Sequence, residues 1–225
     1  GGRCLACNWY CYLREGQPGV CGVRGNVNGK GKLLVYGKVY GGLAVDPIEK
    51  KPFYHFLPGR TALSYGTMGC NFGCLFCQNW EMSQMVKVRA DTGVRPYSKK
   101  PEEIVEEAIS NGCKSIAYTY NEPAVFVEFA YDTMKLAKKT GIKSVFVSNG
   151  YESKESFDLI KDYLDGINID LKGSSEDFYR KYCRARIEPV LENIERFHKA
   201  GVWVEVTTML IDGVNDSEKD IKWIT

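Results

Sequence analysis

From Thr61 onward, short β-rich runs alternate with helical stretches, and this alternation limits the possible folds more than any other feature of the sequence. The β-rich runs cover residues 62–65, 115–120, 144–147, 166–171 and 202–210, and the helical stretches cover 101–110, 124–139, 153–163 and 188–199. Runs of this kind are typical of parallel strands that are covered by helices. They fit an α/β fold, either a doubly wound sheet or an incomplete β/α barrel, and we expect a partial TIM-like barrel. In both architectures the chemistry gathers at the carboxyl ends of the strands.

Three cysteines follow directly on the first of these runs, in the stretch SYGTMGCNFGCLFCQNWEMSQ of residues 64–84. Cys70, Cys74 and Cys77 stand on a Cys-x3-Cys-x2-Cys spacing. Thiolates suit iron-sulfur clusters or zinc, and a closed site needs a fourth ligand. A zinc site would take that ligand from elsewhere, for instance from His55. A 4Fe-4S cluster on three cysteines instead leaves one iron open for a further ligand, and we expect this cluster.

The first sixty residues differ from the rest in their many glycines and turn pairs and in a second set of cysteines. That set consists of Cys4, Cys7, Cys11 and Cys21. Four thiolates in a loop-rich segment suit a closed zinc site, with an auxiliary iron-sulfur cluster as the alternative. We expect a cysteine-rich, zinc-binding module over residues 1–60 and the main domain over 61–225. Within the module, Asn28-Gly29 predicts a turn and 33–40 predicts a β-like run.

Composition and charge narrow the class of protein. A net charge of +2 shows no basic stripe for nucleic acid, and no apolar run approaches the roughly 20 residues that span a bilayer. The cysteine-rich, polar start is unlike a secretory signal, and we expect a cytoplasmic protein whose nine cysteines bind metals in preference to forming disulfides. The last segment, 216–225, opens like a capped helix without an exit signal, which indicates a truncated chain.

The three-cysteine segment, with the aromatic Phe76 directly before the third cysteine, resembles the motif of the radical S-adenosylmethionine (SAM) superfamily. The resemblance implies that the open iron binds the amino and carboxylate groups of SAM, and that Phe76 lies against the adenine. An electron from the cluster then cleaves SAM to a 5'-deoxyadenosyl radical. Five neighbouring segments are similar to radical enzymes of the AmmeMemoRadiSam system, which are relatives of the pyruvate formate-lyase activating enzymes. These segments are DPIEKKP (46–52), HFLPG (55–59), GCNF (69–72), CQNW (77–80) and YTYNEP (118–123).

The same resemblance marks three strand ends as cofactor-binding. They carry Asn121 with Glu122, Ser148 with Asn149, and Asp170 with Lys172. The first pair is similar to a motif that receives the methionine amino group, the second to a turn whose polar atoms face the cofactor, and the third to an Asp-x-Lys motif. Taken singly, these pairs also suit helix capping, a turn and a surface ion pair.

We therefore expect an enzyme that cleaves SAM reductively and abstracts hydrogen from a substrate that no residue identifies. The resemblance implies an electron donor such as a flavodoxin or ferredoxin, and companion proteins of the same system. One alternative is an activase that installs a glycyl radical on a partner protein, and another is an iron-sulfur electron-transfer protein without affinity for SAM.

Five further features complete the set of candidates. We expect Cys113 to be a core residue, His198 to be exposed, and Glu205 with 212–216 to line the substrate side, while Cys183 is considered as a hydrogen-atom donor.

Overall fold

A seven-stranded mixed sheet organises the protein in the computed structural model, which describes residues 1–89, 93 and 95–225. The strands are β5 (Lys38–Pro47), β6 (Thr61–Gly66), β7 (Tyr97–Ser98), β8 (Ser115–Tyr118), β9 (Lys143–Ser148), β10 (Gly166–Asp170) and β11 (Trp203–Thr207). They are ordered β11-β10-β9-β8-β6-β5-β7. The five strands from β6 to β11 are parallel, and β5 joins β6 in antiparallel pairing.

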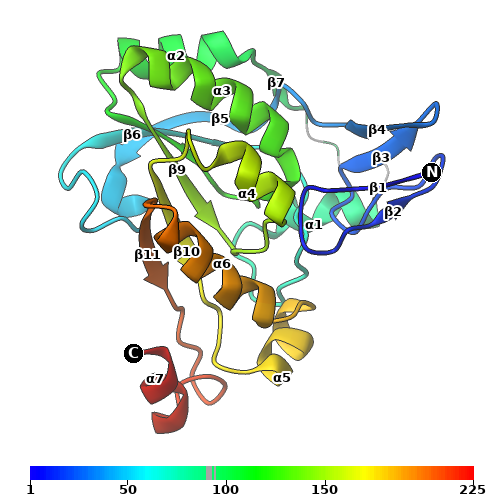
Figure 1. Ribbon diagram of the computed structural model, residues 1–225, viewed down its shortest axis with the longest axis vertical. Helices are drawn as coiled ribbons and strands as arrows, with labels where there is room; N and C mark the ends of the chain where they lie inside the picture. The colour runs from blue at the N-terminus through cyan, green and yellow to red at the C-terminus, as the bar shows by residue number, and fades with distance from the viewer. Residues whose placement is uncertain (90–92, 94) are drawn as a thin grey trace.

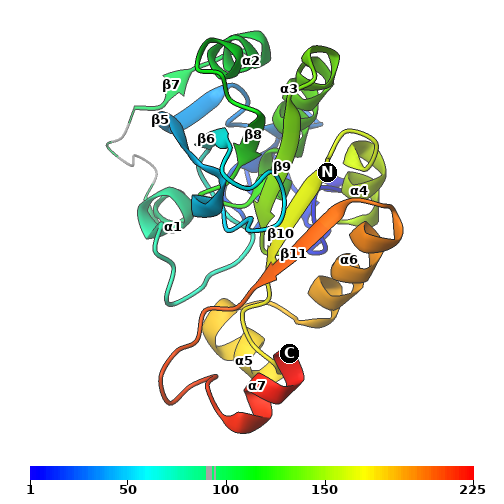
Figure 2. The ribbon, with the colours of Figure 1, turned by 90° about the vertical axis from the view of Figure 1, so that its left-hand side faces the viewer.

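Helices occupy the connections between the parallel strands, as the alternating pattern predicts. They are α2 (Pro101–Ser110), α3 (Val127–Thr140), α4 (Lys154–Ile160) and α6 (Glu188–Lys199). Figure 2 shows α3, α4 and α6 along one side of the strands. The start of α2 follows from Pro101 at its first position, and α3 ends at Gly141, whose φ of 78° few other residues adopt. The parallel strands follow chain order without the reversal that a doubly wound sheet requires.

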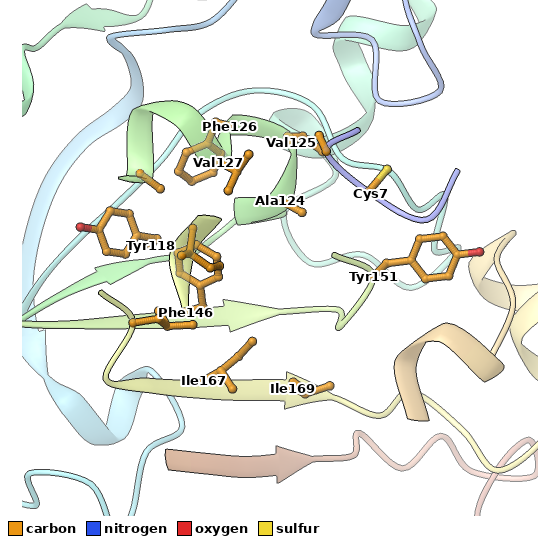
Figure 3. Close-up of a cluster of buried hydrophobic side chains, with 14 of the residues drawn as sticks. Cys7, Tyr118, Ala124, Val125, Phe126, Val127, Phe146, Tyr151, Ile167 and Ile169 are labelled. Atoms are coloured by element: carbon orange, nitrogen blue, oxygen red, sulfur yellow. The ribbon is translucent and has the colours of Figure 1, made fainter. Parts of the chain in front are cut away.

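The side of the sheet toward the helices carries the larger core. Its strand residues are Leu63, Tyr65, Ile116, Tyr118, Phe146, Ile167 and Ile169. In Figure 3 the side chains of Phe146, Ile167 and Ile169 lie near those of Val125 to Val127, which belong to the short turn η2 (Pro123–Phe126) and the start of α3. Successive strand residues point to opposite faces, so the strand residues that alternate with this set point to the other face of the sheet.

The opposite face of the sheet is covered by residues 48–57, which begin with the short 3-10 helix η1 (Ile48–Lys50), continue without regular structure, and are here called the plug. Ile48 and Phe53 are fully buried there against small strand residues, Ala62, Ala117 and Val145. The small side chains leave the space that the plug fills.

Two polar strand residues hold the plug from the side. Asn168 of β10 donates from Nδ2 to the Pro52 carbonyl over 2.9 Å. Glu205 of β11 accepts from the backbone N–H groups of Tyr54, His55 and Phe56 over 2.8 to 3.1 Å. Glu205 therefore anchors the plug and does not line the substrate side, which corrects the expectation from the sequence.

The N-terminal segment forms two small antiparallel pairs beside α1 (Trp80–Val88) and α4 (Figure 1). They are β1 (Gly2–Arg3) with β2 (Tyr12–Leu13), and β3 (Arg24–Val27) with β4 (Lys30–Leu33). The predicted turn is confirmed, since Asn28 and Gly29 join β3 to β4 with φ values of 56° and 78°. The predicted β-like run over 33–40 is confirmed only at its ends, because Leu33 belongs to β4 and residues 38–40 belong to β5. A turn with Gly37 at φ 70° separates β4 from β5.

The C-terminal part continues past β10 through α5 (Glu176–Phe178), the π-helical turn η3 (Tyr179–Cys183) and, after β11, α7 (Glu218–Ile224). Ser217 caps α7 by accepting from the N–H of Asp220, as the sequence predicts. Within the described part of the chain, no helix has the length and apolar character needed to cross a membrane.

Candidate functional site

Cys70, Cys74 and Cys77 line one cavity of about 260 Å³ at the carboxyl ends of the parallel strands. The loop that carries them follows β6 and needs glycine at two points. A Cβ on Gly66 would lie 2.4 Å from the Thr119 carbonyl oxygen, and a Cβ on Gly69 would lie 2.6 Å from that of Cys21. The three thiols are free and face the same space as all seven residues predicted to bind a cofactor.

The donor set of this cavity fits an iron-sulfur cluster, although no three Cys, His, Asp or Glu side chains among the described residues already surround a single point. Three thiols and no histidine line the cavity. The alternative of His55 as a fourth zinc ligand is wrong, because its side chain is 80% exposed beside Glu205 and outside the cavity.

Asn121 holds the cysteine loop in place with its side-chain amide. Its Oδ1 accepts from the Thr67 N–H over 3.0 Å, and its Nδ2 donates to the Gly69 carbonyl over 2.8 Å and to Thr67 Oγ1 over 3.1 Å. All its donors and its acceptor are thus used within the loop, and Asn121 borders the cavity as a structural clamp.

Glu122 is buried next to a second acid, Glu152, and the hydroxyl of Ser148 lies between them. Ser148 Oγ is 2.9 Å from Glu122 Oε1 and 2.6 Å from Glu152 Oε1. Glu122 also accepts from the N–H groups of Ala124 and Asn149. Burial, and after it the charge of Glu152, raise the pKa of Glu122 to about 8.

Asn149 lies between the carboxylate and the cysteine loop. Its backbone N–H donates to Glu122 Oε2, and its Nδ2 donates to Asn71 Oδ1 over 2.7 Å. The same Nδ2 lies 3.9 Å from Cys70 Sγ. Ser148 and Asn149 therefore meet Glu122 at one point, as the order of strand ends predicts.

Asp170 and Lys172 form an ion pair of 3.0 Å beside the thiol of Cys74. Burial acts to lower the pKa of Lys172, but the charge and hydrogen bond of Asp170, together with the nearby thiols of Cys74 and Cys183, outweigh it and raise that pKa. The ammonium group lies 6.0 Å from the ring centre of Phe76, which also lines the cavity. A cation and an aromatic face are thus available on the side of the cavity away from Glu122.

Sequence reasoning missed several residues at the site. Tyr120, in a left-handed conformation with φ 70°, lines the cavity, and its hydroxyl lies 3.1 Å from Nζ of the buried Lys51 of the plug. Cys183 lies against the cysteine loop, where a hydrogen bond with its thiol, followed by burial, raises the pKa of Cys74. Lys51 and Tyr120 belong to no spacing pattern, so only the folded contacts reveal them. Cys183, which the sequence analysis considers as a hydrogen-atom donor, lies behind Cys74 and is not among the residues that line the cavity. Cys113 is buried and His198 exposed, as expected.

Cys4, Cys7 and Cys21 lie near one another beside the cysteine loop, and Cys11 is linked to them through its backbone. The N–H of Cys4 donates to the Cys11 carbonyl over 2.8 Å. The thiols of Cys21 and Cys4 both act electrostatically on Cys7, whose pKa is raised first of all by burial. These residues have the donor chemistry of a thiolate zinc site, and this assignment stays a prediction.

Comparison with known proteins agrees with this geometry. A family model described as the radical SAM superfamily matches residues 64–224. An uncharacterized protein of Methanocaldococcus jannaschii is 45% identical over 99% of this chain and 64% of its own length. A GTP 3',8-cyclase of Rhizobium etli is 25% identical over 66% of this chain and 43% of its own length. The chain thus spans less than two thirds of these relatives.

One solved structure supports the fold alone. SuiB of Streptococcus suis, bound to its precursor peptide SuiA, aligns with a TM-score of 0.54 at 16% identity, over 72% of this chain and 34% of SuiB. The family model, which matches most of the chain, and the three thiols around one cavity lead to a single assignment. The chain belongs to the radical SAM superfamily.

Proposed function

We propose that this protein is an enzyme that cleaves SAM reductively and uses the resulting radical to abstract hydrogen from a substrate. One observation carries the proposal: Cys70, Cys74 and Cys77 share a cavity with the buried acid Glu122 and the Asp170–Lys172 ion pair. A 4Fe-4S cluster bound by the three thiols would supply the electron and an open iron for SAM.

The residues around the cavity suit distinct parts of SAM. Glu122 provides a carboxylate for the methionine ammonium group, held in place by donors from Ser148 and Asn149. Lys172 offers a cation for a carboxylate or a donor for a ribose hydroxyl, and Phe76 offers a ring face for adenine. Burial excludes water from Glu122 and strengthens its electrostatic interactions.

The wider assignment has several parts. The sequential parallel strands and the plug support a partial β/α barrel. The division into a cysteine-rich module, residues 1–60, and a main domain, residues 61–225, rests on composition, and β5 of the first part pairs with β6 of the second. The motifs around the cysteines support membership of the AmmeMemoRadiSam group, with companion proteins. A flavodoxin or ferredoxin is the electron donor that this chemistry needs, and the cytoplasm is the proposed location.

Electron paramagnetic resonance of the anaerobically reconstituted, reduced protein tests the proposal. We expect a cluster signal that changes when SAM is added. Cys77→Ser should abolish the signal, whereas Cys113→Ser should keep it, because Cys113 lies outside the cavity. A cluster signal that SAM leaves unchanged would indicate an iron-sulfur electron carrier and would contradict the proposal.

A further inference from the structure

The hydroxyl group of Ser83 lies against one of the three thiols that line the cavity. Ser83 belongs to α1, where it is the buried residue with 1% exposure, and its Oγ is 3.1 Å from Cys77 Sγ. Either atom can donate as long as the thiol keeps its proton. A cysteine that binds a metal is a thiolate, which can only accept. Ser83 also lines the cavity, so this contact lies on the side where a cluster would bind.

The neighbouring residue Gln84 fixes the direction of this hydrogen bond. Its Oε1 faces Lys87 Nζ, a donor, over 2.9 Å, and its Nε2 faces the Phe72 carbonyl, an acceptor, over 3.0 Å. These two contacts permit only one orientation of the amide. The second hydrogen of Nε2 then points to Ser83 Oγ, which is 3.1 Å away. Because Ser83 Oγ accepts from Gln84, its own proton is left to donate to Cys77 Sγ.

A cation lies at the start of this chain of hydrogen bonds. Lys87 Nζ donates to Gln84 Oε1 and, over 2.7 Å, to the Phe72 carbonyl. Both acceptors are neutral oxygens, so they do not cancel the charge of the ammonium group. The side chain is half-buried, and a charge in surroundings of low dielectric polarises the hydrogen bonds that follow it. The hydroxyl of Ser83 is therefore a stronger donor to Cys77 than a hydroxyl without this chain.

We propose that Ser83 donates a hydrogen bond to the sulfur of Cys77 and thereby raises the reduction potential of the cluster that the three thiolates would bind. Reduction adds one negative charge, and the sulfurs carry part of it. A donor to a sulfur stabilises the reduced cluster more than the oxidised one, which makes it one of the protein's means of setting the potential. Ser83 thus controls how readily the electron donor reduces the cluster. This inference rests on the proposed function, which assigns the cluster to Cys70, Cys74 and Cys77.

The test is a redox titration of the anaerobically reconstituted chain, followed by electron paramagnetic resonance without SAM. In Ser83→Ala we expect the ratio of reduced to oxidised cluster at a fixed potential to fall about tenfold, which equals a shift of about 59 mV to lower potential for one electron. Ser115→Ala removes another buried serine hydroxyl, one outside the cavity, and should keep the wild-type potential. An unchanged potential in Ser83→Ala would overturn the inference.

A second variant covers the case in which Ser83→Ala takes up no cluster. Gln84→Leu removes the amide that orients the hydroxyl and leaves Ser83 and Cys77 in place, so it should also lower the potential. Where both variants bind a cluster, the double variant should shift no further than Ser83→Ala, because Gln84 acts through Ser83. Additive shifts would overturn the orienting role of the amide.

A third measurement detects the proton itself. Electron-nuclear double resonance of the reduced wild type in D2O should show an exchangeable hydrogen coupled to the cluster, which Ser115→Ala keeps and Ser83→Ala or Gln84→Leu loses or weakens. Iron analysis separates the two proposals. A wild type without any cluster would contradict the proposed function as well, whereas a wild type with a cluster whose potential resists both variants would overturn this inference alone.

Discussion

At Ser148, a single hydroxyl group lies between two buried carboxyl groups. Ser148 Oγ is within hydrogen-bond distance of both Glu122 and Glu152, and it accepts from the N–H of Gly150. A hydroxyl donates only one hydrogen bond, so the second contact requires a proton on a carboxyl group. Burial raises the pKa values of both acids. The pair therefore holds a proton at neutral pH that two exposed carboxyl groups would lose.

Because the buried acid pair holds this proton, we expect the free energy of unfolding to depend on pH, and we expect Glu122→Gln to remove that dependence. The folded pKa of Glu122, about 8, is above its ordinary value of 4.5, so folding favours the protonated form. The stabilisation is complete below about pH 4.5 and is lost as the pH rises to about 8, by up to about 5 kcal/mol. Urea unfolding of the cofactor-free protein across this range should show a steeper loss in the wild type than in Glu122→Gln. The exposed Glu218→Gln should follow the wild type, and parallel profiles for wild type and Glu122→Gln would refute the explanation.

A second prediction for a single residue concerns Asn121, which clamps the cysteine loop. Replacing it with alanine leaves the buried Thr67 N–H and the Gly69 carbonyl without their partner. We expect Asn121→Ala to lower the free energy of unfolding by about 2–4 kcal/mol, measured by urea denaturation. Asn111→Ala, at the exposed end of α2, serves as the control and should change it by less than about 1 kcal/mol. A similar loss in both variants would argue against the clamp.

Among the elements, the regular strands and helices follow from the sequence, whereas the plug does not. The period of the apolar residues marks each parallel strand and each connecting helix, because both are repeated local patterns. Pro47, Pro52 and Pro58 correctly indicate irregular backbone, but irregular chain carries no signal for the surface on which it packs. For the same reason, the sequence does not indicate that Lys51 lies at the site, since its contact with Tyr120 joins residues 69 positions apart.

Glu205 tests the attachment of the plug to β11. Burial acts to raise its pKa, but hydrogen bonds from the backbone of residues 54–56 and from Trp203 outweigh it and lower the pKa. Glu205→Gln places an amide N–H₂ against these donors, and we expect a loss of about 1–3 kcal/mol at neutral pH. The stabilisation by the carboxylate is present above its ordinary pKa and disappears as the pH falls. Urea unfolding should therefore show the two proteins converging in acid, and a constant difference would contradict this account.

On the scale of the whole molecule, the three-cysteine site was predictable and its surroundings were not. Thiol spacing is a local property, so Cys70, Cys74 and Cys77 could be assigned from the sequence alone. Cys183 lies beside Cys74, and Glu152 beside Glu122, through contacts between separate elements that no motif encodes. The proposed division at residues 60 and 61 likewise rests on composition, whereas β5 and the plug belong to the sheet of the main domain.

Shortened chains test how much of the N-terminal part the main domain needs. Residues 61–225 lack β5 and the plug, which exposes the apolar side of Ala62, Ala117 and Val145 to water. We expect this fragment to be insoluble or to unfold without cooperativity, whereas residues 38–225 should show a cooperative thermal transition by circular dichroism. A cooperative transition in 61–225 would show that the division at residue 60 is a true folding boundary.

The anchoring of the plug by Glu205 also affects how the chain folds while it is being synthesised. The backbone groups of Tyr54 leave the ribosome 151 residues before the carboxylate that accepts from them. At a synthesis rate of about 5–20 residues per second, that interval is roughly 8 to 30 s. During this time the backbone of Tyr54 to Phe56 lacks its acceptor, and the plug is held only by its apolar contacts with Ala62, Ala117 and Val145 as their strands form. The attachment of the plug is thus completed only when β11, a late strand, has been synthesised and has joined the sheet.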